Sequence, residues 1–169
     1  IAGNHDSPTR IEAPNPLARA CGILLAGFPH TELRPLDIET GAKVLQTAPG
    51  FLELKLPNSP FPLRLLLTPY ANESRMRADL GSEDPESVMR DLLQVHWADL
   101  AEKYCDDQGV NIAMAHLFMI KKGEKPPEEN EKEERPINVK VGGAQVVHTE
   151  CVPAGIQYMA LGHLHRFRN

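Results

Sequence analysis

The stretch VNIAMAH at residues 110–116 is a compact, mostly apolar run that ends in a histidine. Two other apolar runs are followed by similar polar groups: IA at residues 1–2 leads into GNHD at 3–6, and YMAL at 158–161 leads into GHLH at 162–165. Short apolar runs bounded by glycine and polar residues are typical of buried strands. The sequence therefore predicts strands whose ends present polar side chains, and four of the seven histidines lie at these ends.

The intervening sequence predicts a mixed α/β fold. Residues 51–56 alternate between leucine and other residues, and residues 63–68 are nearly all aliphatic, so we expect two strands that pair as a hairpin. Asp84 followed by Pro85 is a helix start, and apolar residues continue at helical spacing as far as Tyr104. Before these elements we expect a loop over residues 3–16, a short helix at 17–21 closed by Gly22, and a strand at 23–26.

Residues 121–136 are strongly charged, with five basic and six acidic side chains that nearly cancel. A segment with so few apolar residues cannot bury a core, so we expect a mobile surface loop there. After it, residues 137–141 and 145–149 alternate weakly around Gly142-Gly143, which predicts another hairpin.

The GHLH motif places two imidazoles on one side of the chain. Residues i and i+2 of an extended segment point to the same side, so His163 and His165 can face one pocket and bind two neighbouring metal ions. Gly162 would let the backbone turn sharply beside the ions. Histidines two residues apart are also common on protein surfaces, so the motif alone leaves both interpretations open.

The GNHD motif offers three kinds of chemistry within one loop. Asn4 can offer an amide oxygen to a cation, His5 can point at a substrate, and Asp6 can accept a hydrogen bond from His5. The same residue types form ordinary polar turns. His116 by itself is more typical of a hydrogen-bonded core residue, and only its combination with the other motifs favours a metal ligand.

The charge balance restricts how this chain would bind nucleic acid. Its formal net charge is −5 and its pI is about 5.8, whereas binding through a basic face usually gives a basic domain. Bound cations or another part of the protein would have to attract DNA, and the alternative is that the chain does not bind it. Three widely spaced cysteines without a CxxC pair, no run of 18 apolar residues and no signal peptide predict a cytoplasmic protein without a membrane span.

In this order, the three motifs resemble those of the calcineurin-like metallophosphoesterase superfamily. More narrowly, the chain is similar to SbcD-type exonuclease subunits from residue 1 to about 168, least so across residues 34–50 and 121–136. The resemblance is strongest in the stretches GNHDSP at 3–8, EAP at 12–14, TPY at 68–70, AHLF at 115–118 and ALGHLHR at 160–166. It implies an α/β fold, a two-sheet sandwich flanked by helices, and a single, partial nuclease domain over residues 1–169.

The resemblance also implies residue roles. Asn4, His116 and His163 would bind one divalent ion and His165 a second, with manganese expected and magnesium an alternative. His5 would be the catalytic acid, oriented by Asp6. An Asp-x-His motif and a Gly-Asp motif normally come earlier in such chains and are absent here, so we expect a chain cut before its first strands. We therefore expect residues 1–169 alone to bind at most one metal ion weakly, to cleave no DNA and to have an exposed sheet edge.

The implied activity is hydrolysis of phosphodiester bonds at DNA duplex ends and hairpins, in DNA repair and recombination. The implied partners are DNA, an SbcC-type ATPase and a second copy of the subunit, within a heterotetramer. One alternative is another calcineurin-like phosphoesterase that acts on a nucleotide or phosphomonoester. Another is a non-catalytic interaction module, which the retained ligand residues argue against.

Overall fold

The computed structural model describes residues 1–79, 84–124 and 146–163. Its described helices are α1 (Pro8–Glu12), α2 (Asn15–Ala20), α3 (Glu73–Met76) and α4 (Pro85–Tyr104), with a 3₁₀ turn at Thr149–Cys151. Its described strands are β1 (Leu36–Asp37), β2 (Lys43–Ala48), β3 (Phe51–Lys55), β4 (Leu63–Thr68), β5 (Val110–His116), β6 (Phe118–Ile120), β7 (Val146–His148) and β8 (Tyr158–Gly162). None of the helices described is both long and apolar enough to cross a membrane.

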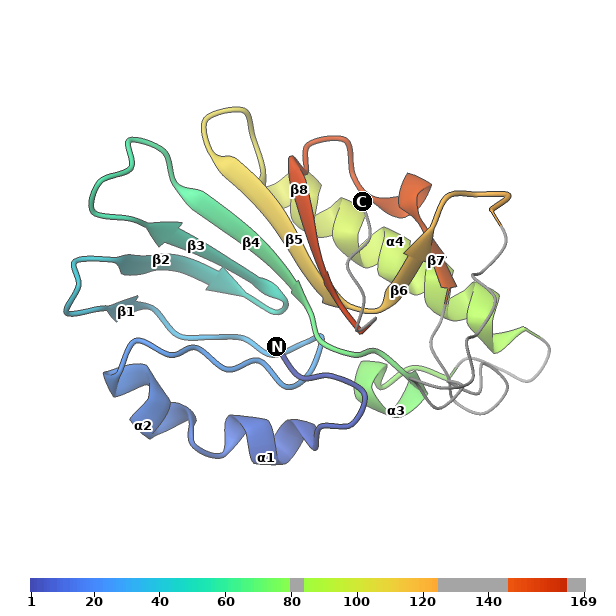
Figure 1. Cartoon of the computed structure of the whole chain (residues 1–169), viewed down its shortest axis with the longest axis horizontal. Coiled ribbons are helices and arrows are strands. Elements are labelled where there is room, and N and C mark those ends of the chain that lie inside the picture. The colour runs from blue at the N-terminus through green and yellow to red at the C-terminus, as the bar shows by residue number, and fades with distance from the viewer. Residues whose placement is uncertain (80–83, 125–145, 164–169) are drawn as a thin grey trace, which may run out of the picture.

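The described strands form two sheets. The larger has the order β1-β2-β3-β4-β5-β8, antiparallel from β1 to β4 and parallel from β4 through β5 to β8, and the smaller pairs β6 with β7. The helix α4 connects the parallel neighbours β4 and β5, and Figure 1 shows it running behind β5 and β8. The predicted α/β class, with two sheets and flanking helices, is confirmed.

The helix α4 covers one face of the sheet as its sequence predicts. Asp84 caps it by accepting a hydrogen bond from the backbone N–H of Ser87, and proline opens the first turn. Its buried side chains pack against Phe51, and the indole N–H of Trp97 donates to Oγ1 of Thr68 at 2.8 Å. The buried residues of this helix, which recur every three or four positions along one face, are Met89, Leu93, Trp97 and Leu100.

The β3-β4 hairpin is confirmed, and both of its faces pack. Phe51 and Leu66 are paired and belong to the core under α4. Leu52 and Leu67 belong to a second cluster on the other face, together with Val44 of β2. The sheet therefore separates two apolar layers, which explains why residues 63–68 are nearly all aliphatic.

Three predictions for the first 26 residues were wrong. Residues 1–2, predicted as the end of a strand, belong to neither described sheet. Residues 8–12, predicted as loop, form α1, because Pro8 is favoured in the first helical turn. Residues 23–26, predicted as a strand, belong to neither described sheet. The side chain of Asn15 takes up both backbone groups of Leu25, which a neighbouring strand would otherwise bond. The short helix before Gly22 is present as α2, and Gly22 has the positive φ of 73° that suits a helix end.

The predicted charged loop and second hairpin fall largely outside the described residues. Residues 125–136 of the loop, residues 137–141 and the Gly142-Gly143 turn are not described. Residues 146–148 of the second predicted strand do form a strand, β7, which pairs in parallel with β6. The mobility of the loop and the hairpin stay predictions.

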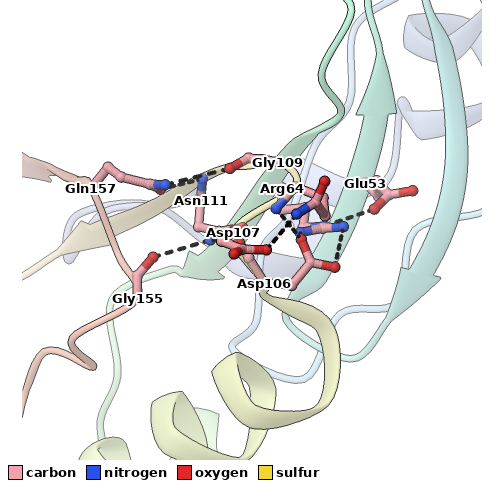
Figure 2. A network of polar contacts seen from close by, with 9 residues as sticks. Glu53, Arg64, Asp106, Asp107, Gly109, Asn111, Gly155 and Gln157 are labelled. Atoms are coloured by element: carbon pink, nitrogen blue, oxygen red, sulfur yellow. Dashed lines mark hydrogen bonds and ion pairs between the residues drawn. The ribbon is translucent and has the colours of Figure 1, made fainter.

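A polar network fixes the amino ends of β4, β5 and β8 (Figure 2). The guanidinium of Arg64 lies between the carboxylates of Glu53 and Asp106 and forms ion pairs with both. The Nδ2 of Asn111 donates to the carbonyl oxygens of Asp106 and Gly155, and its backbone N–H donates to the Gln157 side chain. Arg64 and Asn111 are almost fully buried and their network ties β3, β4, β5 and the chain before β8 together, at the end of the sheet opposite the histidines.

Candidate metal centre

Three segments distant in sequence meet at the carboxyl ends of the parallel strands. The backbone N–H of Tyr70, which follows β4, donates to the carbonyl of Ala2, so residues 2–4 lie beside the end of β4 (Figure 1). His116 ends β5 and is paired with Gly162, the last residue of β8, so that His163 follows directly. Ligand sites in α/β sheets lie at the carboxyl ends of strands, so a binding site is expected at this edge.

The side chain of His116 contacts the side chains of both Asn4 and His163. Nε2 of His116 lies 3.1 Å from Oδ1 of Asn4 and 3.2 Å from Nδ1 of His163. The two imidazole rings are 5.1 Å apart at 71°. The structure thus brings together the three residues predicted to share one ion.

The spacing of these atoms suits a metal ion. A neutral imidazole nitrogen either donates one proton or accepts one, so Nε2 of His116 cannot donate to both Asn4 and His163 in ordinary hydrogen bonds. Donor atoms that bind a common ion at about 2.1 Å, in directions at right angles, lie about 3 Å apart. The observed 3.1 and 3.2 Å match that spacing, and an amide oxygen with two imidazoles suits a borderline divalent ion. The residues therefore fit the metal.

The environment of His116 keeps its imidazole neutral. Burial, and next the neighbouring His163, lower the pKa of His116 to about 4. Only the neutral ring has a lone pair for a metal, so this site needs no deprotonation of His116 near neutral pH.

Two glycines make room for the His116 ring. A Cβ atom on Gly3 would lie 2.7 Å from Cε1 of His116, and one on Gly162 would lie 3.1 Å from Nδ1. The predicted sharp turn at Gly162 is wrong, because the positive φ of 113° belongs to His163. A positive φ raises the conformational free energy of a residue that has a side chain, and residues held in this way are typical of functional sites. Gly162 instead leaves room for the His116 ring, which a Cβ atom at position 162 would crowd.

The GNHD loop is closed by Asp6. One carboxylate oxygen of Asp6 accepts from the backbone N–H of Gly3 at 2.7 Å, and the backbone N–H of Asp6 donates back to the Gly3 carbonyl at 3.3 Å. His5 is exposed at the tip of this loop. No hydrogen bond joins Asp6 to His5 in the described part of the chain, so the predicted orienting contact stays a prediction.

The predicted second-ion ligand cannot be placed. His165 lies outside the described residues. Within residues 1–79, 84–124 and 146–163, no group of three or more His, Cys, Asp or Glu side chains could hold a metal ion. Asn4, His116 and His163 do not form such a group, because Asn4 contributes an amide and only the two histidines belong to these four residue types.

Comparison with known proteins finds relatives among nuclease subunits. The chain is 34% identical over 170 residues to the SbcD subunit of nuclease SbcCD from Bacillus subtilis, covering 98% of this chain and 37% of that protein. The chain is similar to an SbcD-type nuclease subunit. The corresponding SbcCD nuclease subunit of Rhodobacter capsulatus is 28% identical over 168 residues, with 98% of this chain and 38% of that protein covered. No protein-family profile and no solved structure matches the chain.

The chain thus spans under two fifths of the length of these SbcD relatives. Both alignments cover 98% of the chain. The resemblance to SbcD-type subunits predicted from the motifs is confirmed.

Arg75 also contributes to this site, and the sequence did not reveal it. Its Nη1 donates to the Gly3 carbonyl at 2.9 Å and its Nη2 to the Asp6 carbonyl at 2.7 Å. It lies on α3, whose start at Asn72 is a capping residue that sequence inspection could have found. Nothing in the sequence around it predicts that the side chain reaches the loop of residues 3–6.

Proposed function

We propose that this chain forms the core of a metal-dependent nuclease that hydrolyses phosphodiester bonds in DNA. The observation that supports it most is the double contact of His116 Nε2 with the Asn4 amide oxygen and the His163 imidazole. Similarity over 98% of the chain to proteins named as the SbcD subunit of nuclease SbcCD supports the nuclease chemistry.

In this proposal, Asn4, His116 and His163 hold one divalent ion and His165 helps to hold a second, with manganese expected and magnesium an alternative. Such ions lower the pKa of bound water to near neutrality and neutralise charge on the scissile phosphate. The neutral imidazole of His116 suits this role, because its nitrogen lone pair is available to a metal ion near neutral pH.

His5 is the proposed general acid. It follows Asn4 directly and is exposed at the tip of the loop, where a bound phosphodiester could reach it. The carboxylate of Asp6 accepts a hydrogen bond from the Gly3 N–H and so links the backbone on the two sides of His5. A protonated imidazole there would donate its proton to the leaving oxygen.

The proposed substrate and partners come from the resemblance to SbcD-type subunits. DNA is the proposed substrate, at duplex ends and hairpins, and the functional setting is DNA repair and recombination in the cytoplasm. An SbcC-type ATPase and a second copy of the subunit complete the proposed complex. Because the chain has a net charge of −5, metal ions and partner surfaces supply the attraction for phosphates.

The test compares DNA with small esters. The protein, with any flanking sequence its gene encodes, is incubated with Mn²⁺ and end-labelled duplex, hairpin DNA or p-nitrophenyl phosphate. We expect DNA cleavage that His116→Ala and His163→Ala abolish. His30→Ala is the matched control, since the ring contact of His30 is with Phe28 and not with Asn4, His116 or His163. Hydrolysis of the small monoester without DNA cleavage would refute the nuclease in favour of another phosphoesterase.

A further inference from the structure

The loop at residues 3–6, hereafter the Asn4 loop, has little internal support. Its ends are joined by the Gly3 N–H to Asp6 carboxylate bond and by one long backbone bond of 3.3 Å. His5 and Asp6 are exposed, so no apolar packing holds the outer half of the loop. The position of Asn4 therefore depends on what holds the two ends of the loop from outside.

Arg75 holds both ends at once. Its two terminal nitrogens donate to the carbonyl of Gly3 at 2.9 Å and to that of Asp6 at 2.7 Å. The planar guanidinium fixes the angle between two such bonds, so one side chain sets the separation of the two carbonyls. Asn4 lies between them, and its Oδ1 is 3.1 Å from His116 Nε2.

Arg75 is itself anchored to the sheet. Its backbone N–H donates to the side chain of Asn72, which caps α3, and its guanidinium carbon lies 5.0 Å above the Tyr70 ring. Tyr70 follows β4, and its N–H donates to the Ala2 carbonyl immediately before the loop. A continuous set of contacts thus runs from β4 through Tyr70 and Arg75 to the Asn4 loop.

We propose that Arg75 is a positioning residue that sets the Asn4 loop so that Asn4 shares a metal ion with His116. This inference rests on the proposed function, because it assumes that Asn4 is a ligand. Direct binding of a substrate phosphate is the alternative role of Arg75, since the two carbonyl bonds use only two of its five N–H donors. The two roles predict different effects of Arg75→Lys, because lysine keeps the positive charge but lacks the planar pair of N–H donors that bridges the two carbonyls.

The experiment uses Arg75→Met, Arg75→Lys and the matched control Arg19→Met in the whole protein. Arg19 also lies on a short helix and bridges two carbonyls, those of Arg34 and Pro35, neither of which belongs to the Asn4 loop. Mn²⁺ affinity is measured by calorimetry, and amide hydrogen exchange is followed at residues 3–7. Both variants at position 75 should bind Mn²⁺ about tenfold or more weakly, as for other residues that orient ligands, with faster exchange in the loop. Arg19→Met should change neither.

A double-mutant cycle separates positioning from general stability. If Arg75 acts through Asn4, Arg75→Met should weaken Mn²⁺ binding no further in an Asn4→Ala background. Full additivity, full restoration of affinity by Arg75→Lys, or unchanged loop exchange in Arg75→Met would each overturn the proposal. Failure of the proposed function gives a different result: the unmodified protein would bind no Mn²⁺ or cleave no DNA, while the exchange measurement would still show whether Arg75 holds the loop.

Discussion

Replacing Gly3 by alanine adds one methyl group directly against a proposed metal ligand. The new Cβ would lie 2.7 Å from Cε1, 3.0 Å from Nε2 and 3.1 Å from Nδ1 of His116, which places it over the face of the ring. Gly3 does not have a positive φ, so the alanine backbone is unstrained and the effect of the substitution is the contact alone.

The size of the effect follows from these distances. Ordinary van der Waals contact begins at 3.4 Å, so the ring has to move by about 0.7 Å from the 2.7 Å position. Metal–ligand distances are tolerated only within about 0.2 Å. We expect Mn²⁺ affinity to fall by about 10–100-fold, as when other supports of a ligand are lost, and unfolding stability to fall by about 1–3 kcal/mol through overpacking.

Two other glycines give a graded control series. In Gly162→Ala, the nearest His116 atom is 3.1 Å away, so a movement of only about 0.3 Å restores contact at 3.4 Å. In Gly155→Ala, no atom lies within 4 Å of the new Cβ. Calorimetric titration with Mn²⁺ should rank the variants by affinity loss as Gly3→Ala, then Gly162→Ala, with Gly155→Ala unchanged, while urea unfolding confirms that each is folded.

The reasoning is refuted if folded Gly3→Ala binds Mn²⁺ as tightly as the unmodified protein. It is equally refuted if Gly155→Ala loses as much affinity as Gly3→Ala, because the loss would then not follow the distance to His116.

Three further outcomes are expected. His5→Ala should retain Mn²⁺ but lose DNA cleavage by about 10²–10⁴-fold, the usual contribution of a general acid, and loss of Mn²⁺ in calorimetry would show instead that His5 is a ligand. Thr68→Val should lower the free energy of unfolding in urea by about 1–3 kcal/mol, because the buried Trp97 N–H loses its acceptor; an unchanged midpoint would contradict this. Arg64 lowers the pKa of Asp106, so their ion pair stabilises the folded protein fully only above the ordinary aspartate pKa of about 4, and this stabilisation is lost as the pH falls from there through the lowered pKa of Asp106. Arg64→Met should therefore be less stable than the unmodified protein at pH 7, with a smaller difference at pH 3, whereas a constant difference would exclude the linkage.

The elements that were predicted well are those whose signal is local. Residues 63–68 form β4 with the predicted bounds, and the helix after Asp84 ends at Tyr104 as expected. Apolar periodicity and capping residues act within one element, so the sequence specifies them without reference to the rest of the chain. The prediction of a strand at residues 23–26 was wrong because an interaction with another segment decides the structure there. The backbone of Leu25 is hydrogen-bonded to the side chain of Asn15.

The sequence by itself determined which chemical groups are present, namely the amide of Asn4, the imidazoles of His116 and His163 and the glycines beside them, and that both histidines lie at strand ends. Only the tertiary structure decided that these groups meet. Asn4 and His116 are 112 residues apart and His163 and His116 are 47 apart, and their contacts depend on the parallel register of β5 with β8. A shift of that register by one residue would turn every β8 side chain to the other face. The role of Arg75 could not be predicted from the sequence for the same reason. Its hydrogen bonds reach a loop some 70 residues earlier and form only when the sheet has placed both segments side by side.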